Sequence, residues 1–66
     1  MSQEFVEFED VTLIRSTEKA GLFEIEGEEF WLPWSQIDEG SVDKNGESGT
    51  LYLAQWLAKE KGLWDE

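Results

Sequence analysis

The most informative segment of the chain is LFEIEGEEFWL, residues 22–32. Two runs in which apolar and acidic residues alternate flank a glycine, and this pattern is typical of a β-hairpin. A type II′ turn at Gly27-Glu28 gives the cross-strand pairs Glu26–Glu29, Ile25–Phe30, Glu24–Trp31 and Phe23–Leu32. One face of the hairpin is then apolar and the other is largely acidic. Moving the turn back by one residue would place Glu28 opposite Ile25 and mix the faces, so the pattern favours the first register.

The residues before the hairpin extend the predicted sheet. Residues 5–8 and 11–15 are rich in β-branched and aromatic side chains, but their apolar positions change from even to odd numbers. A β-bulge at Glu9-Asp10, or a break into two strands, would bring both runs to one face. Residues 16–19 predict a loop. After the hairpin, Pro33 ends the strand or marks an edge, because proline has no amide proton to donate.

The second half of the chain supplies a further strand and a helix. Asn45-Gly46 is the strongest two-residue turn signal in the sequence, and it leads into an apolar strand at residues 50–53. Residues 54–61 predict a helix, because two lysines suit its carbonyl end and Gly62 suits the left-handed position that follows it.

These elements predict an α+β fold in which residues 1–66 form a single domain. Four or five antiparallel strands make a small sheet, either open or barrel-like, and one C-terminal helix crosses its apolar face. We expect the core to hold the apolar side of the hairpin and three of the four tryptophans, which are Trp34, Trp56 and Trp64.

The composition excludes several kinds of chemistry. The 66 residues contain no cysteine and no histidine, which removes disulfides, thiolate metal sites and the commonest general base. Asp43, Asn45 and Glu47 resemble the start of a calcium-binding loop, but the glycine falls at the fourth position instead of the sixth and the twelfth residue is Ala54. A catalytic carboxylate pair needs one acid in an apolar pocket, whereas these acids occupy positions expected to be exposed. We therefore expect no enzymatic activity, no metal and no cofactor.

Short apolar runs and a polar start bear on the location of the protein. The apolar runs are far shorter than a membrane-spanning helix requires. Residues 1–4 are polar and acidic, and they lack the basic and apolar regions of a signal peptide. We expect a cytoplasmic protein that does not bind membranes.

Acidic charge is the strongest functional signal in the sequence. Sixteen acidic and five basic residues give a net charge of −11, more than the magnitude of about 2–8 that solubility requires in a small domain. Glu24, Glu26 and Glu29 share one side of the predicted hairpin, with Glu28 at its tip. These acids either only keep the protein soluble or resemble a phosphate array. In the second case they fit a basic nucleic-acid-binding surface and repel nucleic acid itself.

Trp31 lies on the acidic side of the predicted hairpin, beside Glu24. It either packs under a loop or neighbouring strand, or it is an aromatic anchor of a binding surface, where tryptophan is over-represented. The candidate partner-binding residues are Glu24, Glu26, Glu28, Glu29 and Trp31.

Several motifs resemble those of one protein family. They are TLIR at residues 12–15, FEIEGEEFWLP at 23–33 followed by SQI at 35–37, and WLAKEKGL at 56–63. With the size and charge, they make the chain similar to small acidic anti-CRISPR proteins of phages and mobile elements, in particular inhibitors of type I-C systems. The resemblance covers residues 11–63.

This resemblance implies a function but assigns no site residues. It implies that the protein binds a Cascade-type CRISPR-Cas surveillance complex in the cytoplasm of the host bacterium and, as a DNA mimic, blocks its access to target DNA. The alternative is a non-enzymatic protein-interaction module of a phage or plasmid, such as a regulatory or antitoxin-like partner. Salt dependence of binding distinguishes the two, because contacts between charges weaken steeply as salt rises.

Overall fold

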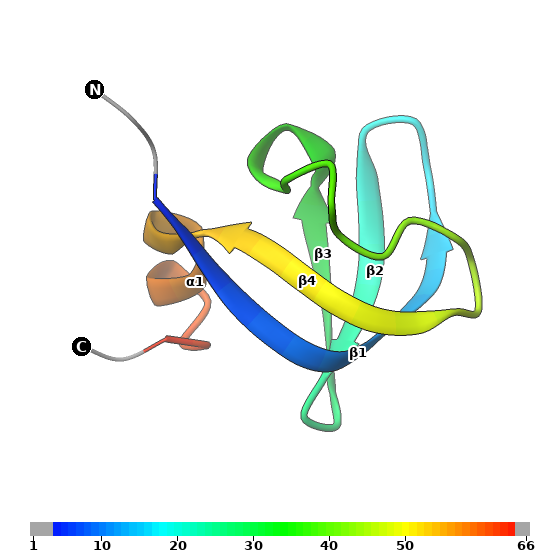
Figure 1. The fold of residues 1–66 in the computed structure, drawn as a ribbon, viewed down its shortest axis with the longest axis horizontal. Helices are drawn as coiled ribbons and strands as arrows, with labels where there is room; N and C mark the ends of the chain where they lie inside the picture. Colours follow the sequence, from blue (N-terminus) through cyan, green and yellow to red (C-terminus); the bar gives the residue numbers. More distant parts are fainter. Residues whose placement is uncertain (1–3, 65–66) are drawn as a thin grey trace.

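Four strands and two short helices follow one another in the computed structural model, which describes residues 4–64. They are β1 (Phe5–Ser16), β2 (Ala20–Ile25), β3 (Glu28–Pro33), the 3-10 helix η1 (Trp34–Gln36), β4 (Ser48–Ala54) and α1 (Gln55–Glu60). Neighbouring strands are antiparallel, and their order in the sheet is β3-β2-β1-β4 (Figure 1). The predicted α+β fold is confirmed, with four strands in the part of the chain described; the sheet curves but does not close into a barrel.

Strand β1 is long and bent, and its two halves pair with different neighbours. The first half pairs with β4 and the second mainly with β2. The ladder with β4 shifts register between Phe8 and Val11, and Asp10 between them has a φ of 59°. The predicted bulge at Glu9-Asp10 is therefore confirmed. It absorbs one residue, so that apolar positions on both sides of the bend face the core.

The hairpin of β2 and β3 turns one residue earlier than the sequence predicts. Ile25 lies opposite Glu28 and Phe23 opposite Phe30, so the turn residues are Glu26 and Gly27. Both have positive φ, 52° and 84°, as in a type I′ turn. This turn type matches the right-handed twist of the flanking strands. The predicted turn at Gly27-Glu28 and its cross-strand pairs are therefore wrong.

The error has a geometrical cause. Moving a two-residue turn by one position changes each cross-strand partner by two residues. Because side chains alternate with a period of two, both faces keep their members. Phe23, Ile25 and Leu32 are buried on one face, as predicted, and Phe30 packs against them while partly buried. The one change is that Glu28 leaves the turn and becomes the partner of Ile25, on the apolar face, where its side chain is exposed.

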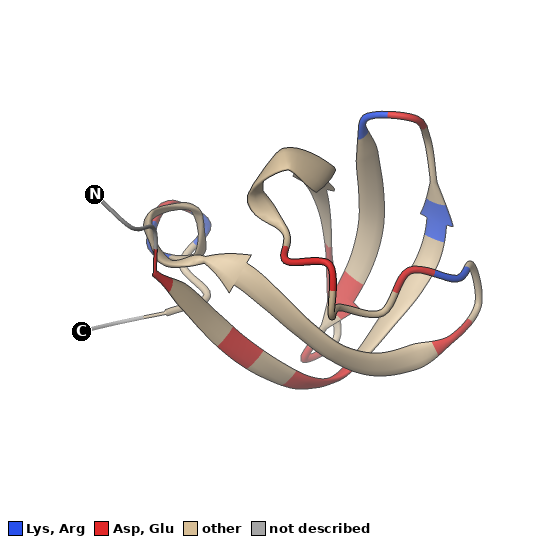
Figure 2. Ribbon diagram, turned by 45° about the horizontal axis from the view of Figure 1, so that its top comes forward, with Lys and Arg blue, Asp and Glu red and all other residues tan. Residues whose placement is uncertain are grey.

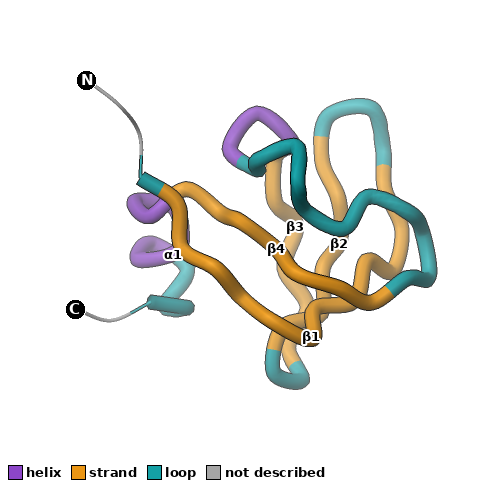
Figure 3. The backbone as a smooth tube through the Cα atoms, viewed as in Figure 1, coloured by secondary structure: helices purple, strands orange, loops and turns teal. Residues whose placement is uncertain are grey.

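All four strands, the loop before β4 and helix α1 contribute to one hydrophobic core. Its buried members are Val11, Leu13, Phe23, Ile25, Leu32, Val42, Leu51, Leu53, Ala54, Leu57 and Ala58. Helix α1 packs mainly on β1 and β4 and lies at one end of the sheet, instead of crossing its apolar face (Figure 3). The helix ends as predicted: Gly62 has a φ of 77°, and the Leu63 amide donates a hydrogen bond to the Ala58 carbonyl at 2.8 Å.

Two of the three tryptophans predicted for the core are partly buried. The ring of Trp34 meets that of Phe23 edge to face, with 5.6 Å between their centroids, and Trp64 packs against the core beside α1. Trp56 is 52% exposed, so its predicted burial is wrong. The short helix turns Leu57 toward the core, which leaves the preceding position facing outward.

The segment between η1 and β4 covers the outer edge of β4. Amides of Asp38 and Val42 donate hydrogen bonds to carbonyls of Tyr52 and Thr50, at 3.0 and 2.9 Å. The Asn45-Gly46 turn forms as predicted, but the residues before it make no regular strand, so the predicted hairpin is incomplete. The edge of β4 is thereby protected, whereas β3 forms the opposite edge of the sheet, and no loop within residues 4–64 is hydrogen-bonded to it.

Candidate functional site

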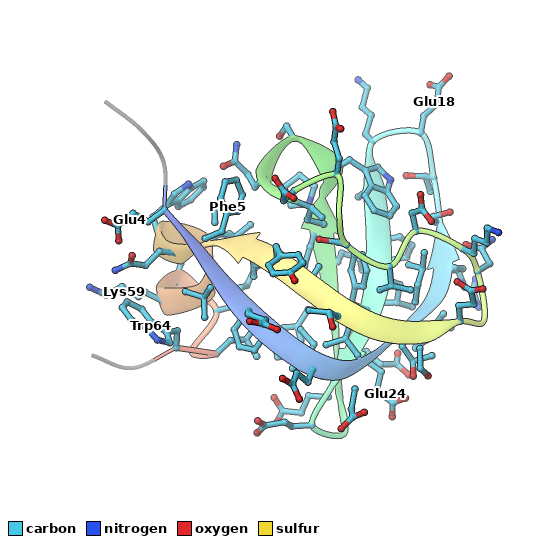
Figure 4. All side chains as sticks on the ribbon, viewed as in Figure 1. Glu4, Phe5, Glu18, Glu24, Lys59 and Trp64 are labelled. Atoms are coloured by element: carbon cyan, nitrogen blue, oxygen red, sulfur yellow. The ribbon has the colours of Figure 1, made fainter. Side chains whose placement is uncertain are left out.

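Four exposed carboxylates surround the turn between β2 and β3. Glu24 lies directly opposite Glu29 on the outer face of the sheet, Glu26 is in the turn, and Glu28 begins β3. All four side chains are exposed. The structure therefore brings together the four acids that the sequence singled out, and we call them the acidic cluster. Figure 4 shows Glu24 near this turn, at the opposite end of the molecule from Glu18.

A like-charge pair lies within the acidic cluster, although it is not the predicted one. The predicted Glu26–Glu29 pair is wrong; Glu24 and Glu29 face each other instead. Side chains directly opposite on paired strands have Cβ atoms about 4.5–5.5 Å apart, so the two carboxylates repel. Within residues 4–64, none of the four forms an ion pair or accepts a hydrogen bond. Within that range the repulsion is therefore not offset by an ion pair, and the cation Arg15 lies opposite Leu22, two residues from Glu24.

Strand β1 adds acids that the sequence reasoning did not include. Asp10 is exposed at the bulge, two residues before Thr12, which pairs with Glu24. Glu7 and Glu9 are exposed further along β1. Figure 2 shows the acidic segments of β1, β2 and the β2–β3 turn along the lower side of the molecule. The acids of β1 could have been predicted from the sequence, because its apolar positions change from even to odd numbers there. Such a change indicates a bulge, and a bulge redirects the side chains around it.

Trp31 lies on the same outer face as the Glu24–Glu29 pair. It is opposite Leu22 and two residues along β3 from Glu29, a step of about 6.6 Å. Its side chain is 47% exposed, so neither a loop nor another strand covers it. The predicted face of Trp31 is confirmed, but its predicted place opposite Glu24 is wrong, because Leu22 lies there. The interpretation that it packs under a loop or neighbouring strand is also wrong. Its role as an anchor stays a prediction.

A separate hollow of about 280 Å³ lies beside η1, away from the acidic cluster. It is lined by Trp34, Ile37, Asp38, Glu39, Ser41 and Asp43. The Asp38 carboxylate accepts a hydrogen bond from the Gly40 amide at 3.0 Å, and the Ser41 hydroxyl accepts one from the Tyr52 amide at 2.8 Å. These polar groups stabilise the loop beside β4. Among the described residues, no buried side-chain nitrogen or oxygen lacks a hydrogen-bond partner.

The calcium-like pattern folds as a turn. The Asn45 side-chain oxygen accepts a hydrogen bond from the Ser16 hydroxyl at 2.9 Å, and the Glu47 amide donates to the Lys44 carbonyl at 3.1 Å. Over residues 4–64, no group of three or more Asp, Glu, His or Cys side chains is arranged to hold a metal ion. In the same range, neither helix has the length and apolar character needed to cross a membrane.

Comparisons of the chain with protein-family models, curated proteins and solved structures found no match. The resemblance to anti-CRISPR proteins therefore stays a prediction from the motifs. The acidic cluster, by its geometry and charge, is the feature of residues 4–64 that bears most directly on function.

Proposed function

We propose that this protein inhibits a bacterial CRISPR-Cas surveillance complex by acting as an acidic mimic of DNA. The acidic cluster occupies the basic surface of the complex that would otherwise bind target DNA. The observation that supports this most directly is the Glu24–Glu29 pair, two facing carboxylates that form no ion pair within residues 4–64. Such a pair destabilises a sheet by a few tenths of a kcal/mol. Folding stability therefore does not account for it, whereas binding to a basic surface would.

The sheet offers an advantage over a flexible acidic tail. Paired strands lie about 4.7–4.9 Å apart and same-face residues repeat every ~6.6 Å, which holds the carboxylates at fixed spacings. A disordered acidic segment would lose conformational entropy on binding, whereas a rigid surface has little left to lose. Binding of this kind needs no catalytic group, cofactor or direct contact with nucleic acid. The protein would act where the complex acts, in the cytoplasm of the host.

A competition assay with matched charge variants tests the proposal. Labelled target DNA is bound to the surveillance complex, and each variant is titrated against it. One variant carries Glu24, Glu26 and Glu29 changed to Lys; the control carries Glu18, Glu39 and Asp43 changed to Lys. Both change the net charge by the same amount, and all six positions are exposed.

The two variants should behave differently. We expect the cluster variant to lose competition, while the control keeps most of it because salt screens distant charges beyond about 8 Å. Equal loss in both would mean that only net charge matters, and equal retention would mean that the acids serve solubility. Either result contradicts the proposal.

A second candidate is a protein-interaction module that binds through apolar contacts, and the exposure of Trp31 favours it. The salt dependence of wild-type binding separates the two functions. A DNA mimic that sets the four carboxylates of the acidic cluster against basic residues should lose about 10² in affinity between 50 and 200 mM salt, if each contact weakens as a phosphate contact does. Binding that is indifferent to salt would favour the interaction module and make Trp31 the residue to mutate.

A further inference from the structure

Strand β3 presents unpaired backbone groups to solvent. In a hairpin with a two-residue turn, the residues that flank the turn exchange both hydrogen bonds, and bonded and non-bonded pairs then alternate. Ile25–Glu28 and Phe23–Phe30 are therefore bonded pairs. It follows that Glu29 and Trp31 turn their backbone N–H and C=O groups away from β2. Within residues 4–64, no other backbone group bonds to them.

The usual protections of an edge strand are weak in β3. Natural edges are blocked by lysine, proline, bulges or a covering loop. The loop before β4 covers the other edge, as the hydrogen bond from Val42 to Thr50 shows. β3 contains no lysine, no bulge interrupts its pairing with β2, and its proline stands at its last position. Only its two glutamates, Glu28 and Glu29, oppose pairing with another strand.

The same glutamates determine which strand can pair. A second copy of this chain would bring its own acidic β3 and a net charge of −11 to the edge, so self-pairing is repulsive. A basic segment would instead meet complementary charge. The charge of the edge therefore favours a partner of opposite sign over a second copy.

We propose that the edge of β3 binds an extended, basic segment of the partner, which adds antiparallel to the sheet as a further strand. This inference rests on the proposed function, because it describes how a basic partner would be held. In strand addition, main-chain hydrogen bonds supply affinity and alternate side chains supply specificity. Here the backbone groups of Glu29 and Trp31 make the hydrogen bonds.

The neighbours of the edge define the sequence of the segment. On the outer face, a residue opposite Glu29 is a lysine or arginine, and one beside Trp31 can place its cation over the ring. On the opposite face, Phe30 is only partly buried, so an apolar side chain there would extend the core. The segment thus alternates basic and apolar residues.

The test uses the full protein, isotope-labelled, and a capped peptide of alternating lysine and valine. Two control peptides have the same side chains and charge; one is N-methylated at every lysine and the other at every valine. In an antiparallel added strand, the lysine amides face Glu29 and Trp31, whereas the valine amides face solvent. The measurements are affinity by titration and hydrogen exchange of single backbone amides.

We expect the parent and valine-methylated peptides to bind and to slow exchange at the Glu29 and Trp31 amides about tenfold or more. The lysine-methylated peptide should bind about tenfold more weakly or worse. Equal affinities of the two methylated peptides, or no added protection at these amides, would overturn the proposal.

A protein variant provides a second test. Glu29→Pro removes the outward N–H without removing a bond to β2, and Glu29→Gln removes only the charge. Edge strands tolerate proline at such positions. We expect the peptide to bind Glu29→Pro about tenfold more weakly than Glu29→Gln. Equal affinities would contradict the proposal, as would a concentration-dependent dimer of the wild type that protects the same amides.

Failure of this inference and failure of the proposed function look different. If methylation of the peptide has no effect but the lysine variant of the acidic cluster loses competition, strand addition is wrong and DNA mimicry stands. If the peptide results hold but the protein does not compete at the surveillance complex, the edge is a docking site and the complex is not its partner.

Discussion

The two faces of the β2–β3 hairpin follow opposite rules. On the core face, Phe23, Ile25 and Leu32 are buried, and each contributes to stability by excluding water. On the outer face, Glu24 and Glu29 oppose each other and weaken the fold slightly. One face is arranged for stability and the other is not. Substitutions on each face should therefore change stability by different amounts and in different directions.

The largest effect is expected at Phe23, a large and fully buried side chain. Phe23→Ala should destabilise the protein by about 3–5 kcal/mol, which is most or all of the stability of a small domain. Phe30→Ala on the edge strand should have a smaller effect, because Phe30 is only partly buried. Chemical denaturation measures both. If both substitutions lower the free energy of unfolding equally, Phe30 is more deeply packed than its exposure indicates.

Gly21 on the same face should be the next most sensitive position. A Cβ atom there would lie 2.9 Å from ring atoms of both Phe23 and Trp34. Gly21→Ala should therefore destabilise by about 1–3 kcal/mol, the usual range for overpacking a core. Gly49→Ala is the control on β4, where the nearest atom, in the Val42 side chain, would be 3.3 Å away. A thermal melt of Gly21→Ala that matches the wild type would contradict this packing.

The turn should show a smaller effect of opposite sign. Glu26 has a φ of 52°, a left-handed conformation that is unfavourable for glutamate and well suited to asparagine. Glu26→Asn would give this turn the same Asn-Gly pair as residues 45–46. It should stabilise by up to about 1 kcal/mol. Gly27→Ala is the opposing control, because Gly27 also has positive φ, and it should destabilise. A loss of stability in Glu26→Asn would argue against the type I′ turn.

The smallest effect is expected on the outer face. Glu24→Gln removes the like-charge pair with Glu29 and should raise stability by a few tenths of a kcal/mol, a gain that high salt abolishes. Glu18→Gln, on the opposite loop, is the control and should change less. The same Glu24 substitution should weaken competition with DNA. If Glu24→Gln lowers stability, the two faces of the hairpin do not differ as described.

The alternation of apolar and acidic residues was enough to predict the two faces of the β2–β3 hairpin, but not the register of its two strands. The acidic cluster and the side of Trp31 follow from alternation alone, and so does the bulge at Glu9-Asp10. The register of β2 against β3 could not be predicted from the alternation, because both candidate turns put the same residues on each face. The preference of twisted strands for a type I′ turn, with Glu26 in a left-handed conformation, decided between them.

Features set by tertiary packing were harder to predict. The exposure of Trp56 depends on where the short helix α1 lies, and the local sequence does not specify that position. The open edge of β3 could not be predicted, because the sequence does not show which strands lie at the edges of the sheet; the strand order identifies them.

The pairing of β1 with both β2 and β4 has a consequence for the order of folding. β2 follows β1 after a loop of a few residues, so this hairpin closes quickly. The ladder between β1 and β4 joins positions as distant as Phe5 and Ala54, and it must wait for closure of a much longer loop. A newly made chain would therefore hold its three-stranded meander, with the acidic cluster in place, before β4 docks. Helix α1 and the end of the core would form last.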